Sequence, residues 1–355
     1  MKWERFINHH LDVVIMLNQT PPNVKKIPLL VRPRYQRYLG DLVGRGKFGK
    51  VYRIGKIANK ILPLGEILVD NDVRFTYLNV PNLGSNISTD SADVEILNLD
   101  EEALRKSLLE DKIHNDISGH SNIPARYDYW LMAEKTLDIS RVCQLYAVHS
   151  QQYIPGNTLY DLIEKGIPLN AVTKCISDIA EALERIHLKG YTHGDTKPHN
   201  VIVSEESPDK KDRCAYIIDY GAGKTSGRYD KLVFTPVYAT PEQVGGFIIP
   251  EVDYMALGLL TYKALTGEDY FGEDYFETLR GVYRHCLWLN QSYSGSDAAD
   301  IVSKARKGTK SRYNYDLPKR FLEALELTLH PRWVVREMEP LKKEAAKLAK
   351  IIKPY

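Results

Sequence analysis

The stretch YTHGDTKPHNVIV, residues 191–203, decides how the rest of the chain is interpreted. It places a histidine, an aspartate, a lysine and an asparagine within eight residues, and a short run of β-branched apolar residues follows. A carboxylate can orient the proton of an attacking hydroxyl, an ammonium group can neutralise a phosphoryl group, and an amide oxygen can ligate magnesium. Asp195, Lys197 and Asn200 are therefore candidates for these three tasks at one site.

A second carboxylate follows further along the chain. Asp219 stands in IIDYG, residues 217–221, at the end of an apolar strand pattern and before a glycine. Hard oxygen ligands at this density suit magnesium rather than zinc. By itself Asp219 would equally fit a turn, but together with Asn200 it is a candidate magnesium ligand.

A glycine cluster precedes these residues in GRGKFGKV, residues 44–51. Three glycines let a backbone approach phosphates closely and offer its N–H groups to them. The spacing G-x-G-x-x-G alone also fits an ordinary hairpin. Lys60, in IANK, alternates with apolar neighbours on the next expected strand, where a phosphate or a carboxylate would satisfy its charge. The pair of features favours a phosphate-binding role.

Composition sets bounds on the partners. The chain has 355 residues, enough for two lobes or for one domain with insertions. Hydrophobic residues make up 43% and charged residues 26%, as in globular proteins. The formal net charge is only +2, so no strong field attracts nucleic acid or a membrane, and we expect neither as a partner.

The cysteines and the N-terminal apolar run indicate the compartment. The apolar run at residues 11–17 is too short to cross a bilayer and lacks the flanks of a signal peptide. We therefore expect a soluble, cytoplasmic or otherwise intracellular protein. The cysteines lack metal-site spacing, and buried reduced thiols are expected at Cys143, Cys175, Cys214 and Cys286.

Strand patterns dominate the first part of the chain. Residues 1–38 contain helix-breaking prolines and are expected to form an ordered extension. The alternation in residues 38–62 predicts three strands, with a two-residue turn at Gly55 and Lys56. The segment 63–99 is expected to hold an extra hairpin that turns at residues 70–72, followed by an exposed loop.

Helical patterns dominate the rest. Asp100 is a plausible N-cap for a helix with an apolar stripe, and a basic helix is expected at residues 337–352. A strand-rich part followed by a helix-rich part predicts an α+β fold. A longer helix before residue 191 is expected from the helical recurrence of Val172, Ile176, Ile179, Leu183 and Ile186, closed by Gly190.

Taken in order, these motifs resemble the eukaryotic-type Ser/Thr protein kinase family. The resemblance covers about residues 39–270 and implies a two-lobed fold, with a small β-rich lobe at 39–154 and a larger helical lobe at 155–355. In that frame residues 1–38 are an N-terminal extension and residues 63–99 an insertion. The segments that carry the resemblance are GRGKFGKV, IANK, HGDTKPHN, IIDYG, TPVYATPE and VDYMALG.

The resemblance implies ATP and Mg²⁺ as cofactors and gives each polar residue a role. Asp195 resembles the catalytic base, Lys197 the γ-phosphate contact, Asn200 and Asp219 the magnesium ligands, and Lys60 the lysine of the α- and β-phosphates. Apart from Lys60, the implied nucleotide contacts are Gly44, Arg45, Gly46, Lys47, Phe48, Gly49, Val51, Ala58, Gln152, Ile154 and Ile202, with Gln151 behind the adenine.

The family also places a glutamate beside the lysine of the small lobe. The apolar positions that follow Glu110 favour it for this role, with Glu101 and Glu102 as alternatives. Asp253 is expected to support the catalytic loop, and Thr235 to contact the catalytic base. Glu242 is expected to pair with an arginine, either Arg332 or Arg336.

One position departs from the family pattern. Gly194 stands where many protein kinases have an arginine that pairs with a phosphorylated activation segment. We therefore predict activity that does not require phosphorylation of this segment, in which Thr225, Ser226 and Tyr229 are the candidate acceptors.

Three functions remain open. A Ser/Thr protein kinase acting on protein substrates is favoured, because Lys197 and TPVYATPE resemble that class. A small-molecule phosphotransferase, which also often carries His-Gly-Asp, is the competitor. A pseudokinase scaffold is disfavoured, since Lys60, Asp195, Asn200 and Asp219 are all present. The 63–99 insertion and the C-terminal helix are candidates for docking a partner, although bracing the lobes is the simpler role for both.

Overall fold

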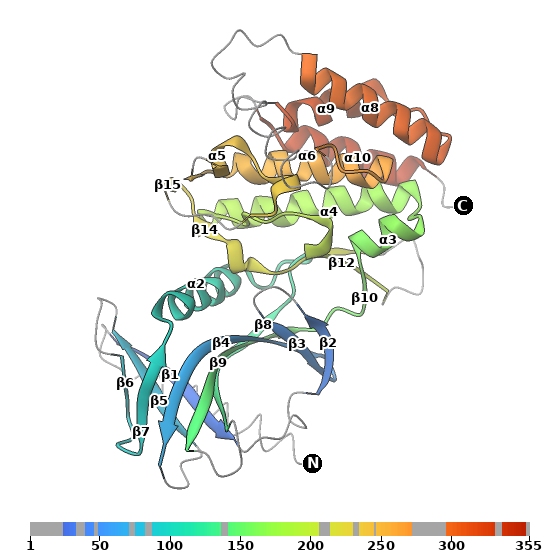
Figure 1. The fold of residues 1–355 in the computed structure, drawn as a ribbon. Coiled ribbons are helices and arrows are strands. Elements are labelled where there is room, and N and C mark those ends of the chain that lie inside the picture. The colour runs from blue at the N-terminus through green and yellow to red at the C-terminus, as the bar shows by residue number, and fades with distance from the viewer. Residues whose placement is uncertain are drawn as a thin grey trace. The chain divides into compact units, whose positions relative to one another are not determined.

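The computed structural model describes residues 24–32, 40–45, 49–70, 75–81, 87–135, 141–205, 214–229, 234–244, 246–271, 296–330 and 336–352. The chain forms two compact units. The first contains Met1–Leu108 and Tyr127–Gln152, and the second contains Leu109–Arg126 and Tyr153–Tyr355. Figure 1 shows strands gathered in the first unit and helices in the second, in agreement with the predicted α+β class.

The first unit is built on one nine-stranded sheet with the order β2-β3-β4-β9-β8-β1-β5-β6, and β7 pairs with β4. β1 and β8 run parallel, whereas the pairs β2–β3, β3–β4, β4–β9, β4–β7, β1–β5 and β5–β6 are antiparallel. The strands are β1 (Val24–Arg32), β2 (Asp41–Arg45), β3 (Lys50–Ile54), β4 (Ile57–Val69), β5 (Phe75–Pro81), β6 (Ser88–Thr89), β7 (Val94–Leu99), β8 (Arg126–Lys135) and β9 (Val142–Gln152).

The three strands expected after residue 38 are confirmed as β2, β3 and β4. Gly55 and Lys56 form the turn between β3 and β4, and the φ angle of Gly55 is 58°. This left-handed conformation suits glycine, which has no Cβ to clash with the backbone. The turn sets the register that places Lys60 on β4 directly opposite Val51 on β3.

The hairpin expected around residues 70–72 is wrong. β4 ends at Val69 and β5 begins at Phe75, but the two strands do not pair: β5 pairs with β1 and β6, while β7 takes the edge of β4. β1, which the sequence placed in an extension, is an inner strand between β8 and β5. The cause is a shared apolar core, to which β1, β4 and β5 contribute Ile27, Leu29, Leu64, Ile67, Val69 and Leu78.

Helix α2 (Glu101–Ile117) begins as predicted. The Asp100 carboxylate accepts a hydrogen bond from the backbone N–H of Ala103 at 2.8 Å, which caps the first turn. Leu104 is fully buried in the core of the first unit, and Ile113 and Ile117 are fully buried in the core of the second. The apolar stripe of this helix therefore serves both cores.

The second unit is mainly helical, and the predicted stripe on α4 is entirely buried. Its helices are α3 (Leu159–Lys165), α4 (Leu169–Leu188), α5 (Pro241–Val244), α6 (Glu251–Thr266), α8 (Ser296–Tyr313), α9 (Lys319–Thr328) and α10 (Glu339–Ile351). Its short strands are β10 (Gly156–Thr158), β11 (Tyr191–Thr192), β12 (Val201–Ser204), β13 (Ala215–Ile217), β14 (Lys224–Thr225), β15 (Arg228–Tyr229) and β16 (Phe247–Ile248).

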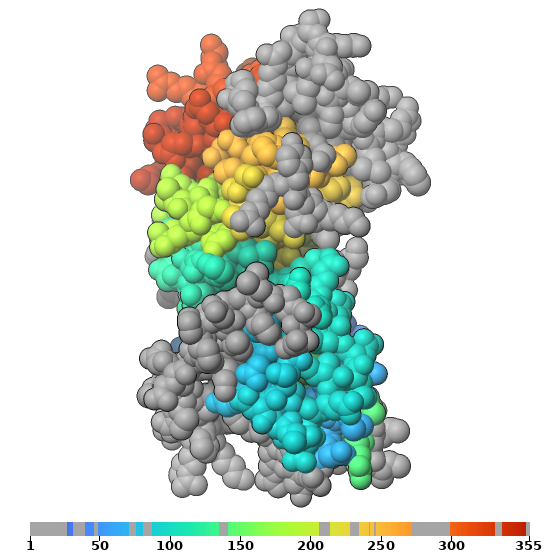
Figure 2. All heavy atoms as spheres, turned by 90° about the vertical axis from the view of Figure 1, so that its left-hand side faces the viewer, coloured from blue at the N-terminus to red at the C-terminus, as the bar shows by residue number. Residues whose placement is uncertain are grey.

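The predicted C-terminal helix is α10, which lies along α4. α10 packs against α4, and Lys342 donates to Glu184 at 2.6 Å across their contact. In Figure 1 both helices lie in the second unit, and in Figure 2 the red C-terminal residues lie above the yellow-green residues of that unit. Of the cysteines, Cys143 and Cys175 are buried and Cys214 is half-buried, while Cys286 lies outside the described residues. Within the described ranges no helix is long and apolar enough to cross a membrane.

Candidate active site

The loop between β11 and β12 carries the predicted catalytic residues, and a buried carboxylate holds it. Asp253, near the start of α6, is 1% exposed. It accepts hydrogen bonds from the backbone N–H groups of His193 and Gly194 at 2.8 and 2.9 Å, and from the Thr196 hydroxyl at 3.3 Å. The expected support of the loop by Asp253 is thus present in the geometry.

Asp253 keeps its charge although it is buried. Burial alone would raise its pKa, but hydrogen bonds and nearby imidazoles outweigh this cost and hold the pKa below its usual value. One of these donors is His187 at the end of α4, whose Nε2 lies 2.8 Å from Asp253 Oδ2. An ionised carboxylate makes stronger hydrogen bonds than a neutral one, so the loop is held firmly.

Gly194 has a backbone reason to be glycine. Its φ angle is +77°, a region that side chains disfavour, and a Cβ there would lie only 2.8 Å from the carbonyl oxygen of Ala222. The Gly194 carbonyl accepts a hydrogen bond from Gln243 Nε2 at 2.7 Å. The position where the family often has arginine is therefore built here for a residue without a side chain.

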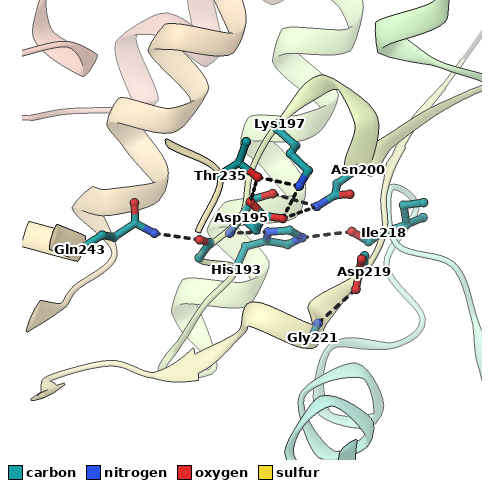
Figure 3. A network of polar contacts seen from close by, with 10 residues as sticks. His193, Asp195, Lys197, Asn200, Ile218, Asp219, Gly221, Thr235 and Gln243 are labelled. Atoms are coloured by element: carbon teal, nitrogen blue, oxygen red, sulfur yellow. Dashed lines mark hydrogen bonds and ion pairs between the residues drawn. The ribbon is translucent and has the colours of Figure 1, made fainter. Parts of the chain in front are cut away.

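The three polar groups at the centre form a closed triangle (Figure 3). The Lys197 ammonium donates to Asp195 Oδ2 at 2.6 Å and to the Thr235 hydroxyl at 2.7 Å, and that hydroxyl donates to Asp195 Oδ1 at 2.7 Å. Asn200 Nδ2 donates to the backbone oxygen and to Oδ2 of Asp195, at 2.9 and 3.1 Å. Thr235 thus contacts the predicted base, as the sequence led us to expect.

The two predicted magnesium ligands are linked through the backbone. Ile218 N–H donates to the Asn200 carbonyl at 2.9 Å, and Asp219 is the next residue. Asp219 is exposed and adopts a left-handed conformation with φ 66°, and its Oδ1 accepts from Gly221 N–H at 3.3 Å. Because the Asn200 amide nitrogen faces Asp195, its oxygen is turned away from that carboxylate. An amide and a carboxylate oxygen on linked segments fit a hard cation such as Mg²⁺.

The predicted nucleotide contacts divide between the two units. Val51, Ala58 and Lys60 lie on β3 and β4 of the first unit, where Lys60 is half-buried on a strand paired on both sides. Ile202 lies on β12 of the second unit, and Ile154 is buried there. Gly44 and Arg45 end β2 and Gly49 precedes β3, while Gly46, Lys47 and Phe48 lie outside the described residues. Gln151 and Gln152 end β9 and are half-buried.

Burial separates the three candidate glutamates on α2. Glu110 is 7% exposed. Glu101 and Glu102 lie on the solvent side of the helix. Glu101 forms an ion pair with Arg105 and Glu102 with Lys106, in each case one helical turn further along the chain. Exposed pairs of this kind are ordinary features of helix surfaces. Glu110 is therefore the buried one of the three, and its pairing with Lys60 stays a prediction.

The arginine partner of Glu242 is Arg336. Two guanidinium nitrogens lie 2.9 and 3.3 Å from the two carboxylate oxygens, and the arginine side chain is fully buried. Arg336 also donates to the backbone oxygens of His330 and Glu251. Arg332, the alternative, lies outside the described residues.

The sequence missed three residues that position the site. His187 supports Asp253, and Gln243 holds Gly194 from α5. Thr240, the residue before Pro241 and Glu242, exchanges hydrogen bonds with Gln243 at 3.1 and 3.2 Å. Of the three, only His187 could have been found from the sequence. A buried carboxylate such as Asp253 needs hydrogen-bond donors, and His187 lies in the last turn of the helix that precedes the catalytic loop.

A family model described as "Protein kinase domain" matches residues 94–331. The chain belongs to the protein kinase family. The catalytic loop, Asp219 and the segment with Thr235 lie inside the matched range of this kinase, whereas the glycine motif and Lys60 precede it. The predicted protein kinase family and α+β fold are confirmed.

Curated relatives of this kinase include Ser/Thr kinases. The chain is 32% identical over 226 residues to maternal embryonic leucine zipper kinase of Danio rerio, covering 58% of this chain and 30% of that protein. It is 28% identical over 318 residues to Aurora kinase A-B of Xenopus laevis, covering 88% and 65%. Serine/threonine-protein kinase SBK1 of Mus musculus is 28% identical over 206 residues, covering 53% and 46%. The chain thus spans less than two thirds of each relative.

Proposed function

We propose that the chain transfers the γ-phosphate of ATP to serine or threonine hydroxyls of protein substrates. The observation that carries this proposal is the triangle of Asp195, Lys197 and Thr235. A carboxylate held between an ammonium group and a hydroxyl is prepared to orient a second hydroxyl for attack on a phosphoryl group.

Each residue has one task in this reaction. Asp195 orients the acceptor hydroxyl and takes its proton, while Thr235 and Asn200 fix the direction of the carboxylate. Lys197, 2.6 Å from Asp195, offsets negative charge that develops on the transferred group. Asp253 holds the loop so that these groups stay in place during the reaction.

The cofactors follow from the same residues. Asn200 and Asp219 would hold Mg²⁺, which supplies positive charge to the phosphates when bound. Lys60 and the glycine motif would bind the phosphates, and residues 151–154 the adenine. With ATP as the donor, we place the activity inside the cell. The division into lobes at residue 154 is part of the proposal.

We also propose that the activity does not require phosphorylation of the activation segment. Three contacts of residues in and around this segment support the proposal. β14 pairs with β11, β15 pairs with β16, and Thr235 contacts Asp195. Gly194 offers no cation for a phosphate to pair with. The protein treated with a phosphatase should keep its rate, and so should a triple variant with Thr225→Ala, Ser226→Ala and Tyr229→Phe.

The deciding experiment follows labelled γ-phosphate from Mg-ATP to a generic basic protein. Asp195→Asn keeps the shape of the side chain but removes its charge, so transfer should fall by about 100- to 10,000-fold while ATP still binds. Asp316→Asn, which removes an exposed carboxylate on the protein surface, is the matched control and should keep the wild-type rate.

The label also separates the competing functions. Label on serine or threonine that is lost in Asp195→Asn supports the protein kinase. Turnover of a small hydroxylated metabolite without label on any protein would replace it with a small-molecule phosphotransferase. Nucleotide binding without transfer to either class of acceptor would indicate a scaffold.

A further inference from the structure

Helix α2 is joined to the strand that enters the catalytic loop by three polar side chains. The Lys112 ammonium donates to Asp116 Oδ2 at 2.6 Å and to the Tyr191 hydroxyl at 2.8 Å. That hydroxyl in turn donates to Asp116 Oδ2 at 2.6 Å, so the three groups close a ring of hydrogen bonds. We call Lys112, Asp116 and Tyr191 the α2 clamp. Tyr191 lies 75 residues after Asp116, so the clamp links distant segments of the second unit.

The α2 clamp differs from an ordinary ion pair on a helix surface. Lys112 and Asp116 are one helical turn apart, and such a pair contributes little alone. Tyr191 adds a buried side chain from another part of the chain. Hydrogen bonds with Asp116 and Tyr191 raise the pKa of Lys112 to about 12, and those from Lys112 and Tyr191 hold the pKa of Asp116 below its usual value. Both charges are therefore present at neutral pH and strengthen the hydrogen bonds of the Tyr191 hydroxyl.

Tyr191 begins the segment that carries Asp195. It is the first residue of β11 and lies directly opposite Thr225 on β14. The backbone N–H of His193, two residues further on, is held by Asp253. Asp253 thus holds the middle of the catalytic loop, whereas the α2 clamp fixes the strand from which the loop starts.

Packing alone does not account for the Tyr191 hydroxyl. The ring lies in the apolar core of the second unit, where a phenylalanine ring would fill the same space. A buried hydroxyl needs hydrogen-bond partners, and this one bonds to two side chains of α2. Hydrogen bonds are directional whereas apolar contacts are not, so the clamp fixes where β11 lies along the helix. Position matters here, because a displacement of about 1 Å can cost about 100-fold in rate.

We propose that Lys112, Asp116 and Tyr191 are positioning residues, which fix β11 on helix α2 and thereby hold Asp195 where it meets the acceptor hydroxyl. This inference rests on the proposed kinase function, since Asp195 has its task in that reaction. The three side chains have no task in binding ATP, Mg²⁺ or the acceptor in the reaction above. Loss of the α2 clamp should therefore lower kcat and leave KM nearly unchanged.

The test compares variants of the α2 clamp with a matched control on the same helix. Tyr191→Phe removes the hydroxyl and keeps the ring, so kcat for a serine peptide should fall about 5- to 20-fold, while KM for ATP and for the peptide changes by less than about twofold. Lys112→Met removes the ammonium group and should lower kcat to a similar extent, whereas Lys112→Arg should keep most of it. Lys106→Met breaks the exposed ion pair with Glu102 on α2 and should leave kcat unchanged.

A double variant shows whether the residues of the clamp act together. Tyr191→Phe and Lys112→Met open the same ring of hydrogen bonds, so their combination should stay within about twofold of the slower single variant. Effects that multiply would overturn the clamp as one unit. Variants that unfold at a lower urea concentration but keep the wild-type kcat per folded molecule would also overturn it, because the clamp would then stabilise the fold without positioning Asp195.

Hydrogen exchange tests the α2 clamp independently of phosphate transfer. Tyr191→Phe should raise the exchange rates of the backbone amides of His193 and Gly194 by about tenfold, while the amide of Ile179 in the middle of α4 keeps its rate. Unchanged exchange at both loop amides would overturn the inference. Faster exchange there, in a protein without any transfer that depends on Asp195, would support the clamp and overturn the proposed kinase function. The Lys112 side chain is 61% exposed, so Lys112→Met carries both tests if Tyr191→Phe fails to fold.

Discussion

A single residue, Gly194, fixes the shape of the catalytic loop. Its φ angle is +77°, and its carbonyl is held by Gln243 while the next residue, Asp195, faces Lys197. A side chain at this position would meet two obstacles, the left-handed backbone and the carbonyl oxygen of Ala222. Replacing the glycine by arginine would therefore move the loop rather than restore a phosphate sensor.

The matched pair Gly194→Ala and Gly190→Ala separates these two obstacles. Gly190 has a similar φ of +76°, but no atom lies within 4 Å of an added Cβ. Gly190→Ala should lose about 1 to 2 kcal/mol of unfolding free energy from backbone strain alone. Gly194→Ala should lose more and should also lower the rate of phosphate transfer. Equal losses in urea unfolding, with an unchanged rate, would contradict a role for the Ala222 contact.

The sequence predicts those site residues that lie together in one short segment with a recognisable spacing. Asp195, Lys197 and Asn200 share one loop, and their hydrogen bonds follow from that spacing. It could not choose between Arg332 and Arg336, because the path of the chain between α9 and α10 decides which guanidinium reaches Glu242. It missed Gln243 because a glutamine in a short helix has no distinctive pattern before its neighbours are known.

At the scale of elements, strand existence was easier to predict than strand pairing. Alternating apolar residues identified β4 and β5, but the nearest strand in sequence was not the partner in the sheet. A polar turn at residues 70–72 fits a hairpin locally, whereas the apolar side chains of β1 determine where β5 gains most by pairing. The prolines of residues 1–38, one of which lies in β1, led to the prediction of an extension, although Ile27 and Leu29 alternate as in a strand.

Leu29→Ala tests whether β1 is an integral strand of the first unit. Leu29 is 0% exposed and packs in the shared core, so the substitution should cost about 3 to 5 kcal/mol of unfolding free energy through lost burial and the remaining cavity. Leu97→Ala on β7, where the side chain is 47% exposed, should change stability by less than about 0.5 kcal/mol. Urea unfolding and hydrogen exchange of β5 would show the difference; if both variants behaved alike, β1 would be dispensable.

At the scale of the whole molecule, the second unit depends on contacts between distant parts of the chain. Glu242 and Arg336 are 94 residues apart and form a buried ion pair that joins the end of the activation segment to the residues before α10. The residue next to Glu242 is Gln243, which holds Gly194. The C-terminal part of the chain therefore helps to position the catalytic loop.

A double-mutant cycle measures this connection. Arg336→Met leaves the Glu242 carboxylate buried without its partner, which should cost about 3 to 5 kcal/mol and lower the transfer rate. Adding Glu242→Leu removes the stranded charge, so the double variant should be more stable than the sum of the single effects by about 1 to 3 kcal/mol. Full recovery is not expected, because the carbonyls of His330 and Glu251 also lose a donor. The same cycle on the exposed pair Lys319 and Glu323 should show a coupling below about 0.5 kcal/mol. If the buried pair were as additive as the exposed one, the link from the C-terminal part to the catalytic loop would have to run through apolar packing alone.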